Sequence, residues 1–265
     1  MSTRIVAIAN QKGGVGKTTT TYHLAWAAHK QGLKVLVIDT DPQGNLTTAM
    51  TQGTLSPETA GLADALTGTN ETTMEQVLVP ALWDGVDLVP ATTPGLALVR
   101  DELFSLPMGR EKKLKKAIHS LGEDRYDLVL IDCPPSMDQL TVNALVAATE
   151  VLIVSHTQVF SMNGITLLLG NIEQVQEHYN EDLTIAGIVI NQFEKTHNDH
   201  QEAKLLLTQG AEEMGIYVFE PSIPKLKPIS KTMATGDSLD AQKNETTLRL
   251  AAIYDRYISK LMKKA

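Results

Sequence analysis

Short continuous hydrophobic runs recur along this chain, and most of them end in polar or glycine-rich residues. Runs of about four to eight apolar residues are typical of strands that are buried on both faces of a sheet. We expect such strands at residues 5–9, 35–38, 86–91, 126–132, 151–154, 184–191 and 218–224. Most of these runs are separated by segments in which apolar residues recur at helical spacing. The alternation predicts an α/β fold, a doubly wound and mostly parallel sheet with helices on both faces.

Helices are expected in the segments between these strands. They should follow Lys17 and occupy residues 62–66, 74–78, 109–121, 163–178, 202–214 and 246–264. The lysines of 109–121 fall opposite an apolar stripe, which indicates a solvated face rather than a DNA-binding stripe. The last helix carries its own apolar stripe and ends in lysines, as an interfacial membrane helix would. Because Asp255 and the tyrosines dilute that pattern, we expect this helix to dock on the core.

Composition limits the classes of protein to which the chain can belong. Its 265 residues, 43% of them hydrophobic, fit one large α/β domain spanning 1–265. The net charge of -8 means that any contact with nucleic acid must come from a local basic patch. The single cysteine, Cys133, excludes a disulfide framework and suits a reducing cytoplasm. Neither a secretory signal nor a run of 18 apolar residues occurs in the sequence, so we expect a cytoplasmic protein.

A glycine-rich loop between the first predicted strand and the following helix is the strongest chemical signal. Strand, glycine loop, lysine and helix start form the context that a P-loop requires. Glycines let backbone N–H groups approach phosphate closely, and the helix N-terminus adds partial positive charge. Lys17 would neutralise the β- and γ-phosphates, and the Thr18 hydroxyl would bind Mg²⁺. The candidate nucleotide-binding residues are Lys12, Gly13, Gly14, Val15, Gly16, Lys17, Thr18 and Thr19.

Acidic residues follow two of the predicted strands. Asp39 and Asp41 come after the run 35–38, and Asp132 ends the run 126–132. Parallel α/β sheets bind ligands at the carboxyl ends of their strands, so these carboxylates should lie near the P-loop. Asp132 has the position of a Walker B aspartate, and the expected metal ligands are Thr18, Asp39 and Asp132. An Asp-Pro-x-Gly sequence alone would indicate a turn, but its distance from the P-loop favours a nucleotide switch.

The details of these motifs resemble those of the ParA/MinD superfamily. Gln11 stands where a standard P-loop has glycine, and the loop carries two lysines, which is the deviant Walker A signature. DTDPQGN at 39–45 and DCPPS at 132–136 resemble the switch I and switch II segments of the same family. The resemblance covers nearly the whole chain. It implies that Lys12 reaches the ATP of a partner subunit and that Asp41 positions the attacking water, so the candidate catalytic residues are Lys12, Lys17 and Asp41.

The resemblance also implies contacts for the base and for DNA. Asn191, Pro224 and Lys225 match positions that contact adenine in relatives, although Asn191 could simply end its strand. Basic residues in this C-terminal region form a non-specific DNA surface in the family. The corresponding candidates are Lys225, Lys227 and Lys231 in an expected loop, with Lys195 a weaker one, unless these lysines are merely solvated. Gln158 and Asn163 stand where the family usually has glutamates.

As a whole, the resemblance implies a ParA/Soj-type partition ATPase. Such a protein uses ATP and Mg²⁺ to form a homodimer that binds non-specific DNA on the nucleoid. A ParB-like centromere-binding protein then stimulates slow hydrolysis, and the cycle segregates chromosomes or plasmids. The absence of an N-terminal extension matches the short, chromosome-type members.

Two alternatives remain open. The first is a MinD-like or cargo-positioning ATPase that acts at a membrane, which we do not expect here, or on protein assemblies. The second is a metabolic P-loop enzyme, against which Lys12 argues. The sequence does not reveal the cargo.

Two further features invite a metal or redox interpretation. Cys133 has no second cysteine beside it, so we expect a small buried residue rather than a reactive thiol or an iron–sulfur ligand. His197 and His200 lie three residues apart in a polar segment without a third histidine or cysteine nearby. We expect a helix N-cap by Asn198 or Asp199 there, rather than a metal site.

Overall fold

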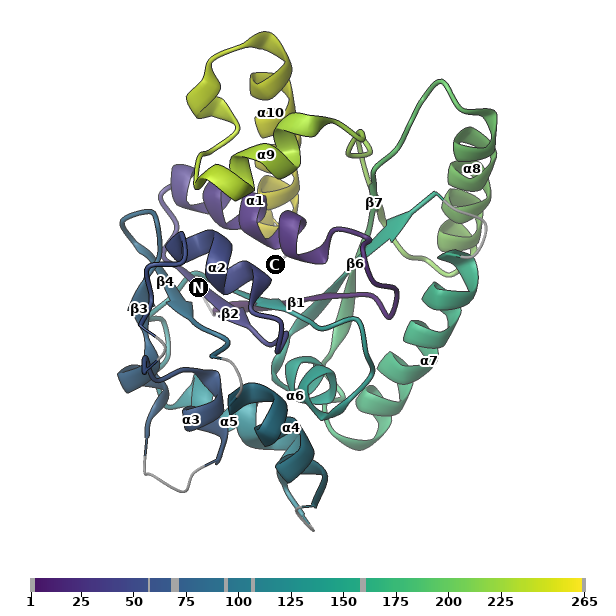
Figure 1. Cartoon of the computed structure of the whole chain (residues 1–265). Helices are drawn as coiled ribbons and strands as arrows, with labels where there is room; N and C mark the ends of the chain where they lie inside the picture. The colour runs from purple at the N-terminus through teal and green to yellow at the C-terminus, as the bar shows by residue number, and fades with distance from the viewer. Residues whose placement is uncertain are drawn as a thin grey trace.

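One eight-stranded sheet organises the chain. The computed structural model describes residues 3–56, 58–67, 72–92, 95–105, 108–157 and 161–263. Within them the strand order is β3-β4-β2-β5-β1-β6-β7-β8, and every neighbouring pair except β3–β4 is parallel (Figure 1). The strands are β1 (Arg4–Ala9), β2 (Val35–Asp39), β3 (Val79–Pro80), β4 (Val86–Val89), β5 (Leu128–Asp132), β6 (Glu150–His156), β7 (Thr184–Asn191) and β8 (Val218–Phe219). The predicted α/β fold class is confirmed.

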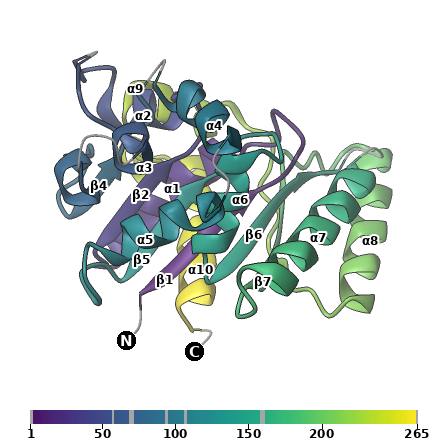
Figure 2. The same ribbon diagram turned by 90° about the horizontal axis from the view of Figure 1, so that it is seen from below.

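Helices cover both faces of the sheet, which is why its strands are continuously apolar. In β1, Ile5 and Ala7 face one core while Val6 and Ile8 face the other, because side chains alternate along a strand. One face is covered by α1 (Lys17–Lys30), α2 (Asn45–Thr51), α9 (Lys227–Thr235) and α10 (Glu245–Lys263) (Figures 1 and 2). The other is covered by α3 (Leu62–Thr67), α4 (Gly95–Ser105), α5 (Lys113–His119), α6 (Gln139–Ala147), α7 (Ser161–His178) and α8 (Asn198–Glu213).

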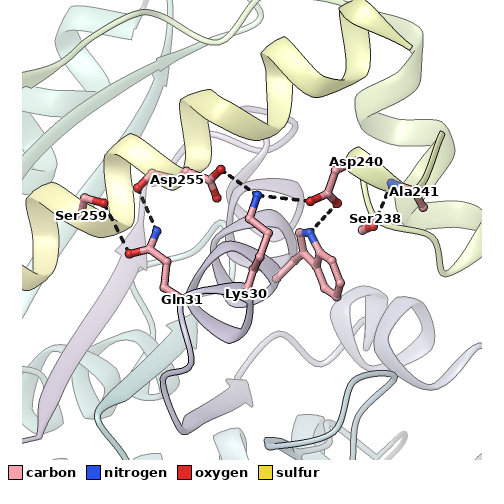
Figure 3. Close-up of polar contacts among 8 residues, drawn as sticks. Lys30, Gln31, Ser238, Asp240, Ala241, Asp255 and Ser259 are labelled. Carbon is pink, nitrogen blue, oxygen red and sulfur yellow. Dashed lines mark hydrogen bonds and ion pairs between the residues drawn. The ribbon is translucent and has the colours of Figure 1, made fainter. Parts of the chain in front are cut away.

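The C-terminal helix α10 docks on α1, as predicted. Its apolar stripe is buried and includes Tyr254 and Tyr257. The hydroxyl of Tyr257 donates a hydrogen bond to the Pro221 carbonyl over 2.6 Å. Polar contacts run beside this packing (Figure 3). Lys30 Nζ lies 3.2 Å from Asp240 Oδ2 and 2.7 Å from Asp255 Oδ2. The apolar face of α10 is therefore occupied within the protomer, and no helix among the described residues is long and apolar enough to cross a membrane.

Several predicted boundaries were wrong for identifiable reasons. The strand expected at 218–224 ends at Phe219, because the prolines at 221 and 224 cannot donate to a neighbouring strand. The strand expected at 86–91 ends at Val89, before Pro90. The helix expected over 109–121 divides into a 3-10 turn, Arg110–Lys112, and α5, and the one at 74–78 is a 3-10 turn, Met74–Val77.

Other differences concern helix starts and whole helices. The segment that we expected as a lysine-rich loop contains α9, whose second residue is Pro228, a residue well suited to the first turn of a helix. The N-cap of α8 is His197, without a side-chain cap, so the predicted cap by Asn198 or Asp199 was wrong. The sequence pattern also missed α2, α4 and α6. Gln158 lies outside the described residues; Asn163 lies in α7, but its side chain is not described.

Candidate functional site

The candidate P-loop follows the central strand of the sheet. β1 lies between β5 and β6, so the chain leaves it where the strand order reverses, the position at which open α/β sheets bind ligands. The same register places Asp39 at the end of β2 beside Asp132 at the end of β5. A cleft of about 710 Å³ opens here. Its lining includes Gly13, Gly14, Gly16, Lys17, Thr18, Thr19 and Asp41, which confirms that the loop and the first switch segment meet.

Two glycines shape the loop. Gly14 and Gly16 have φ angles of 73° and 89°, in the left-handed region that side chains disfavour. Gly16 is also the N-cap of α1. A Cβ atom at Gly16 would lie 2.0 Å from Nδ2 of Asn191, so only glycine fits between the loop and the end of β7.

Asn10 fixes the start of the loop. Its Oδ1 accepts the backbone N–H of Lys12 over 2.9 Å, and its Nδ2 donates to the Val154 carbonyl on β6 over 2.7 Å. The polar residue that ends β1 therefore attaches the loop to the neighbouring strand. This bond fixes the backbone from which Lys12, itself half-buried, projects.

Lys17 is buried inside the loop. Its Nζ donates to the Lys12 carbonyl over 3.4 Å, and its side chain borders the cleft. Burial lowers the pKa of Lys17, and the negative charge of Asp132 is the largest opposing influence. An ammonium held in this way, at the start of α1, is suited to bind an anion in the cleft.

The two aspartates have different surroundings. Both are fully buried. Asp39 Oδ2 accepts hydrogen bonds from the backbone N–H and the hydroxyl of Thr47, over 2.8 and 2.7 Å, and its Oδ1 accepts the N–H of Asp41 over 3.1 Å. Asp39 therefore ties the switch segment and α2 to the sheet.

One carboxylate oxygen of Asp132 remains available as a ligand. Its Oδ1 accepts the Thr21 hydroxyl over 3.1 Å, whereas its Oδ2 is buried without a hydrogen-bond partner among the described residues. Burial raises the pKa of Asp132, the charge of Asp39 raises it further, and the nearby Thr18 hydroxyl opposes the shift. A divalent cation would neutralise this charge, since hard cations such as Mg²⁺ take carboxylate oxygens. Of the two aspartates, Asp132 is thus the better candidate to hold a metal.

Asp41 borders the cleft directly. Its Oδ1 accepts the backbone N–H of Gln43 over 3.0 Å, which is the local turn that the sequence Asp-Pro-x-Gly indicates. The turn predicted from the sequence is therefore present, and it lies at the edge of the cleft. The second carboxylate oxygen has no hydrogen bond within the described residues.

A second hollow, of about 440 Å³, adjoins the loop on the side of β7. Its lining brings together Thr19, Asn191, Pro224 and Lys225, which are far apart in sequence. Asn191 Nδ2 donates to the Val15 carbonyl over 2.8 Å, and its Oδ1 accepts the N–H of Gln192 over 2.8 Å. One amide hydrogen and one lone pair of Asn191 remain, so the residue can both brace the loop and contact a base.

The candidate DNA-binding lysines lie on one exposed surface. Lys227 and Lys231 are four residues apart on α9 and therefore share a helix face. Lys225 precedes this helix, and its Nζ lies 3.6 Å from Oε2 of Glu194. A groove of about 720 Å³ continues from Pro224 and Leu226 toward α10. Further cations in its lining are Lys195, Lys204, Arg249 and Arg256.

Some residues of the site carried no recognisable sequence signal. The cleft is also lined by Thr48, Gln192 and Met233. Glutamine occurs in many loops, whereas Thr48 and Met233 belong to α2 and α9, which the sequence pattern did not predict. Arg249 and Arg256 were missed because they are exposed residues on the polar face of α10, where charged side chains are common. The thiol of Cys133 is buried, and burial raises its pKa, so the prediction of an interior residue is confirmed.

Comparisons with known proteins agree with this geometry. A family model described as an AAA domain (AAA_31) matches residues 3–185. Chromosome partitioning protein ParA of Caulobacter vibrioides (strain NA1000 / CB15N) is 36% identical over 235 residues, which are 88% of this chain and 85% of the relative. Sporulation initiation inhibitor protein Soj of Bacillus subtilis (strain 168) is 33% identical over 238 residues, 88% of each chain.

A solved structure is similar over almost the full length. The crystal structure of cobyrinic acid a,c-diamide synthase from Mycobacterium smegmatis, with bound ATP analog and magnesium, has a TM-score of 0.79 and 30% sequence identity. The similarity covers 98% of this chain and 95% of that one. By sequence, fold and motifs, this chain belongs to the AAA-domain family that its model defines, and within it to the ParA/MinD type of P-loop partition ATPases.

Proposed function

We propose that the chain binds and hydrolyses ATP with Mg²⁺ and uses the ATP-bound state to bind DNA as a dimer. The observation that carries the proposal is the continuity of one cleft. It joins the glycine loop to Asp41. Lys17 and Thr18 in its lining are neighbours of the buried Asp132, whose second oxygen has no hydrogen-bond partner among the described residues. Such a cleft offers backbone donors and Lys17 to phosphates and a carboxylate to the accompanying metal.

The metal would be held by Thr18 and Asp132, with Asp39 behind them. Asp39 already accepts three hydrogen bonds, so its role is to position the switch segment and α2 around the metal. Bound Mg²⁺ would supply charge neutralisation at the β- and γ-phosphates. Asp41 lies at the edge of the cleft and would orient a water molecule toward the terminal phosphate.

Dimer formation rests on Lys12 and Gly13. Gly13 is exposed, its φ lies outside the left-handed region, and a Cβ atom there would meet only Pro135, at 3.9 Å. Among the residues that the structure describes, nothing therefore requires glycine at this position, whereas the close approach of a second subunit would. Lys12 stands next to it and would reach the phosphates of the partner's ATP, where a second cation stabilises the charge that develops in hydrolysis.

The basic surface of α9 and the adjoining groove would bind the phosphate backbone of DNA. Lys227 and Lys231 share one exposed helix face, and the groove adds Lys195, Arg249 and Arg256. Because the net charge is -8, attraction to DNA must come from such a local patch. Two patches brought together in a dimer would bind more tightly than one, without sequence specificity and with strong salt dependence.

The biological role that follows is the partition of chromosomes or plasmids. Curated relatives that are 33–36% identical carry the names ParA and Soj, and they are covered over most of their length. Release from DNA would follow hydrolysis, stimulated by a ParB-like protein. A biosynthetic enzyme is the second candidate, favoured by the similarity to the cobyrinic acid a,c-diamide synthase structure. Such an enzyme would hydrolyse ATP without binding DNA.

Asp41→Ala separates these possibilities. In the ATPase cycle it should reduce hydrolysis at least about 100-fold while ATP still binds, so that the protein accumulates on DNA. DNA co-sedimentation with ATP and Mg²⁺ measures this accumulation. Lys17→Ala, which removes the phosphate-binding ammonium, is the matched control and should bind neither ATP nor DNA. Normal hydrolysis by Asp41→Ala, or DNA binding that ignores ATP, would contradict the proposal.

A further inference from the structure

Three metal-binding side chains meet where β7 leads into α8. Glu194 lies in the turn that follows the strand, His197 is the N-cap of α8 and His200 lies in the first turn of the helix. The three residues are spaced three positions apart in a turn that continues directly into α8. Residues at this spacing lie on the same side of a helical turn. One ligand atom of each residue lies within 4.8 Å of the other two.

The three side chains approach one another closely. Nε2 of His200 lies 4.0 Å from Oε2 of Glu194. The imidazole centroids of His197 and His200 are 5.5 Å apart, with their planes inclined by 60°. Two ligands of a tetrahedral zinc ion stand about 3.4 Å apart, as bond lengths of about 2.0–2.1 Å require. Small side-chain rotations would therefore bring these three donors to one ion.

His197 has no role in capping its helix. The side chain of His197 is exposed and accepts no hydrogen bond from the backbone N–H groups of α8. Asparagine, aspartate, serine and threonine are the residues that favour N-caps, so the presence of histidine here needs another explanation. A ligand role for His197 supplies one, and Glu194 is the third donor that the spacing of the two histidines alone did not indicate.

Thr157 forms a hydrogen bond with the His200 ring nitrogen Nδ1. Its hydroxyl lies 2.8 Å from Nδ1 of His200, and the threonine side chain is buried. An imidazole that binds metal through Nε2 carries its proton on Nδ1 and donates it to such an oxygen, which fixes the ring. Without metal, Nδ1 accepts the backbone N–H of Glu194 over 3.2 Å. Metal binding through Nε2 would place the ring proton on Nδ1 and give up this longer bond, while the contact with Thr157 would be kept.

Lys225 is the one cation that competes for the same carboxylate among the described residues. Its Nζ lies 3.6 Å from Oε2 of Glu194, and its side chain is 58% exposed. A single exposed ion pair at this distance contributes little, so a divalent cation with two further ligands can displace it. The ammonium of Lys225 is then released toward solvent.

We propose that Glu194, His197 and His200 form a binding site for a borderline-soft divalent cation, with Zn²⁺ as the best fit. Two imidazole nitrogens favour zinc over Mg²⁺ or Ca²⁺, which take oxygen ligands. Three protein ligands leave a fourth position for water or for a ligand of another molecule. The site is separate from the Mg²⁺ site proposed at Asp132 and does not depend on the proposed partition function.

Zinc titration of the full, nucleotide-free chain tests the site. The protein is first freed of metal and then titrated with Zn²⁺ against a chromophoric chelator, with excess Mg²⁺ present to occupy the carboxylates near the P-loop. We expect one equivalent to bind. His197→Ala and Glu194→Gln should each weaken that binding at least about 30-fold, because each removes one of three ligands. Substituting Co²⁺ should give the visible absorption of a four-coordinate site in the wild type alone.

His178→Ala is the matched control. His178 is exposed and its Nε2 lies 3.8 Å from Oε2 of Glu177, a histidine–glutamate pair without the third donor. Zinc affinity should be unchanged in this variant. Thermal unfolding without metal verifies that His197→Ala is folded. Wild-type affinity in folded His197→Ala, or an equal loss in His178→Ala, would overturn the site.

Discussion

The cleft has two sides that are built in different ways. On the phosphate side, Asn10, Gly16 and Lys17 follow one another in sequence, and Asp132 joins them through the pairing of β5 with β1. On the base side, Thr19, Asn191 and Pro224 come from three distant segments that only the fold brings together. On the phosphate side, Asn10 and Lys17 are buried and held by hydrogen bonds, whereas the proposed base side merges into an exposed lysine-rich surface.

This difference predicts how well each side tolerates substitution. Buried groups with fixed partners provide a rigid anion site, which nearly any substitution damages. Exposed groups such as Lys227 have few contacts and tolerate change, so their substitution should alter one partner interaction and leave the rest intact. Substitutions on the two sides should therefore differ in the size and in the selectivity of their effects.

Gly16→Ala should have the largest effect, since Gly16 is where the two sides touch. The new methyl group would lie 2.0 Å from Asn191 at a φ of 89°, which we expect to lower the free energy of unfolding by about 2–4 kcal/mol. ATP affinity should fall at least about 100-fold, as measured by calorimetry. Gly14→Ala is the control: it has a φ of 73° but meets nothing within 4 Å, so it should cost about 1 kcal/mol. Equal effects of the two substitutions would contradict the role of Asn191 as a brace.

Charge reversal on α9 should have a smaller and more selective effect. Lys227→Glu with Lys231→Glu should weaken DNA binding by about 10- to 100-fold and flatten its dependence on salt, because phosphate contacts are lost. ATP affinity should change less than about threefold, since both side chains are exposed. Filter binding at several salt concentrations measures the first effect. Lys112→Glu with Lys116→Glu, an equally spaced exposed pair near α5, should leave DNA binding unchanged. A similar loss in both variants would instead indicate a simple response to net charge.

The buried aspartates should respond in opposite directions. A pKa raised by burial means that folding favours the protonated form of Asp132, so stability is present below the ordinary carboxyl pKa and is lost as pH rises through the raised value. Asp132→Asn should therefore stabilise the nucleotide-free protein by about 1–2 kcal/mol at neutral pH, and less in acid. Burial also raises the pKa of Asp39, to about 6, but Asp39→Asn should destabilise the protein because an amide cannot accept all three donors around this side chain. Urea unfolding between acid and neutral pH measures both effects; a gain in Asp39→Asn would contradict this comparison.

The sequence predicted the glycine loop between β1 and α1 because the signals for it are local. The glycines, Lys17 and the preceding apolar strand lie within one short segment, and buried parallel strands are hydrophobic throughout. The contact of Asn191 with the base follows from the resemblance alone and stays a prediction. Nothing in the sequence around Thr19 or Asn191 indicates that these two residues lie close together in the fold. The missed α9 begins at Lys227-Pro228, where lysines suggest a loop, and its short apolar face depends on packing against α1 and α2. Glu194 escaped notice because a single carboxylate three residues before a histidine is common.

The central claim is that ATP joins two protomers through Lys12 and the exposed Gly13. The most direct measurement is the mass of the protein by light scattering, with saturating ATP and Mg²⁺ and with hydrolysis blocked by Asp41→Ala. We predict a dimer with ATP and a monomer with ADP, and we predict that adding Lys12→Ala returns the ATP-bound protein to a monomer. A protein that remains monomeric with ATP, or a dimer that is indifferent to Lys12, would contradict the account.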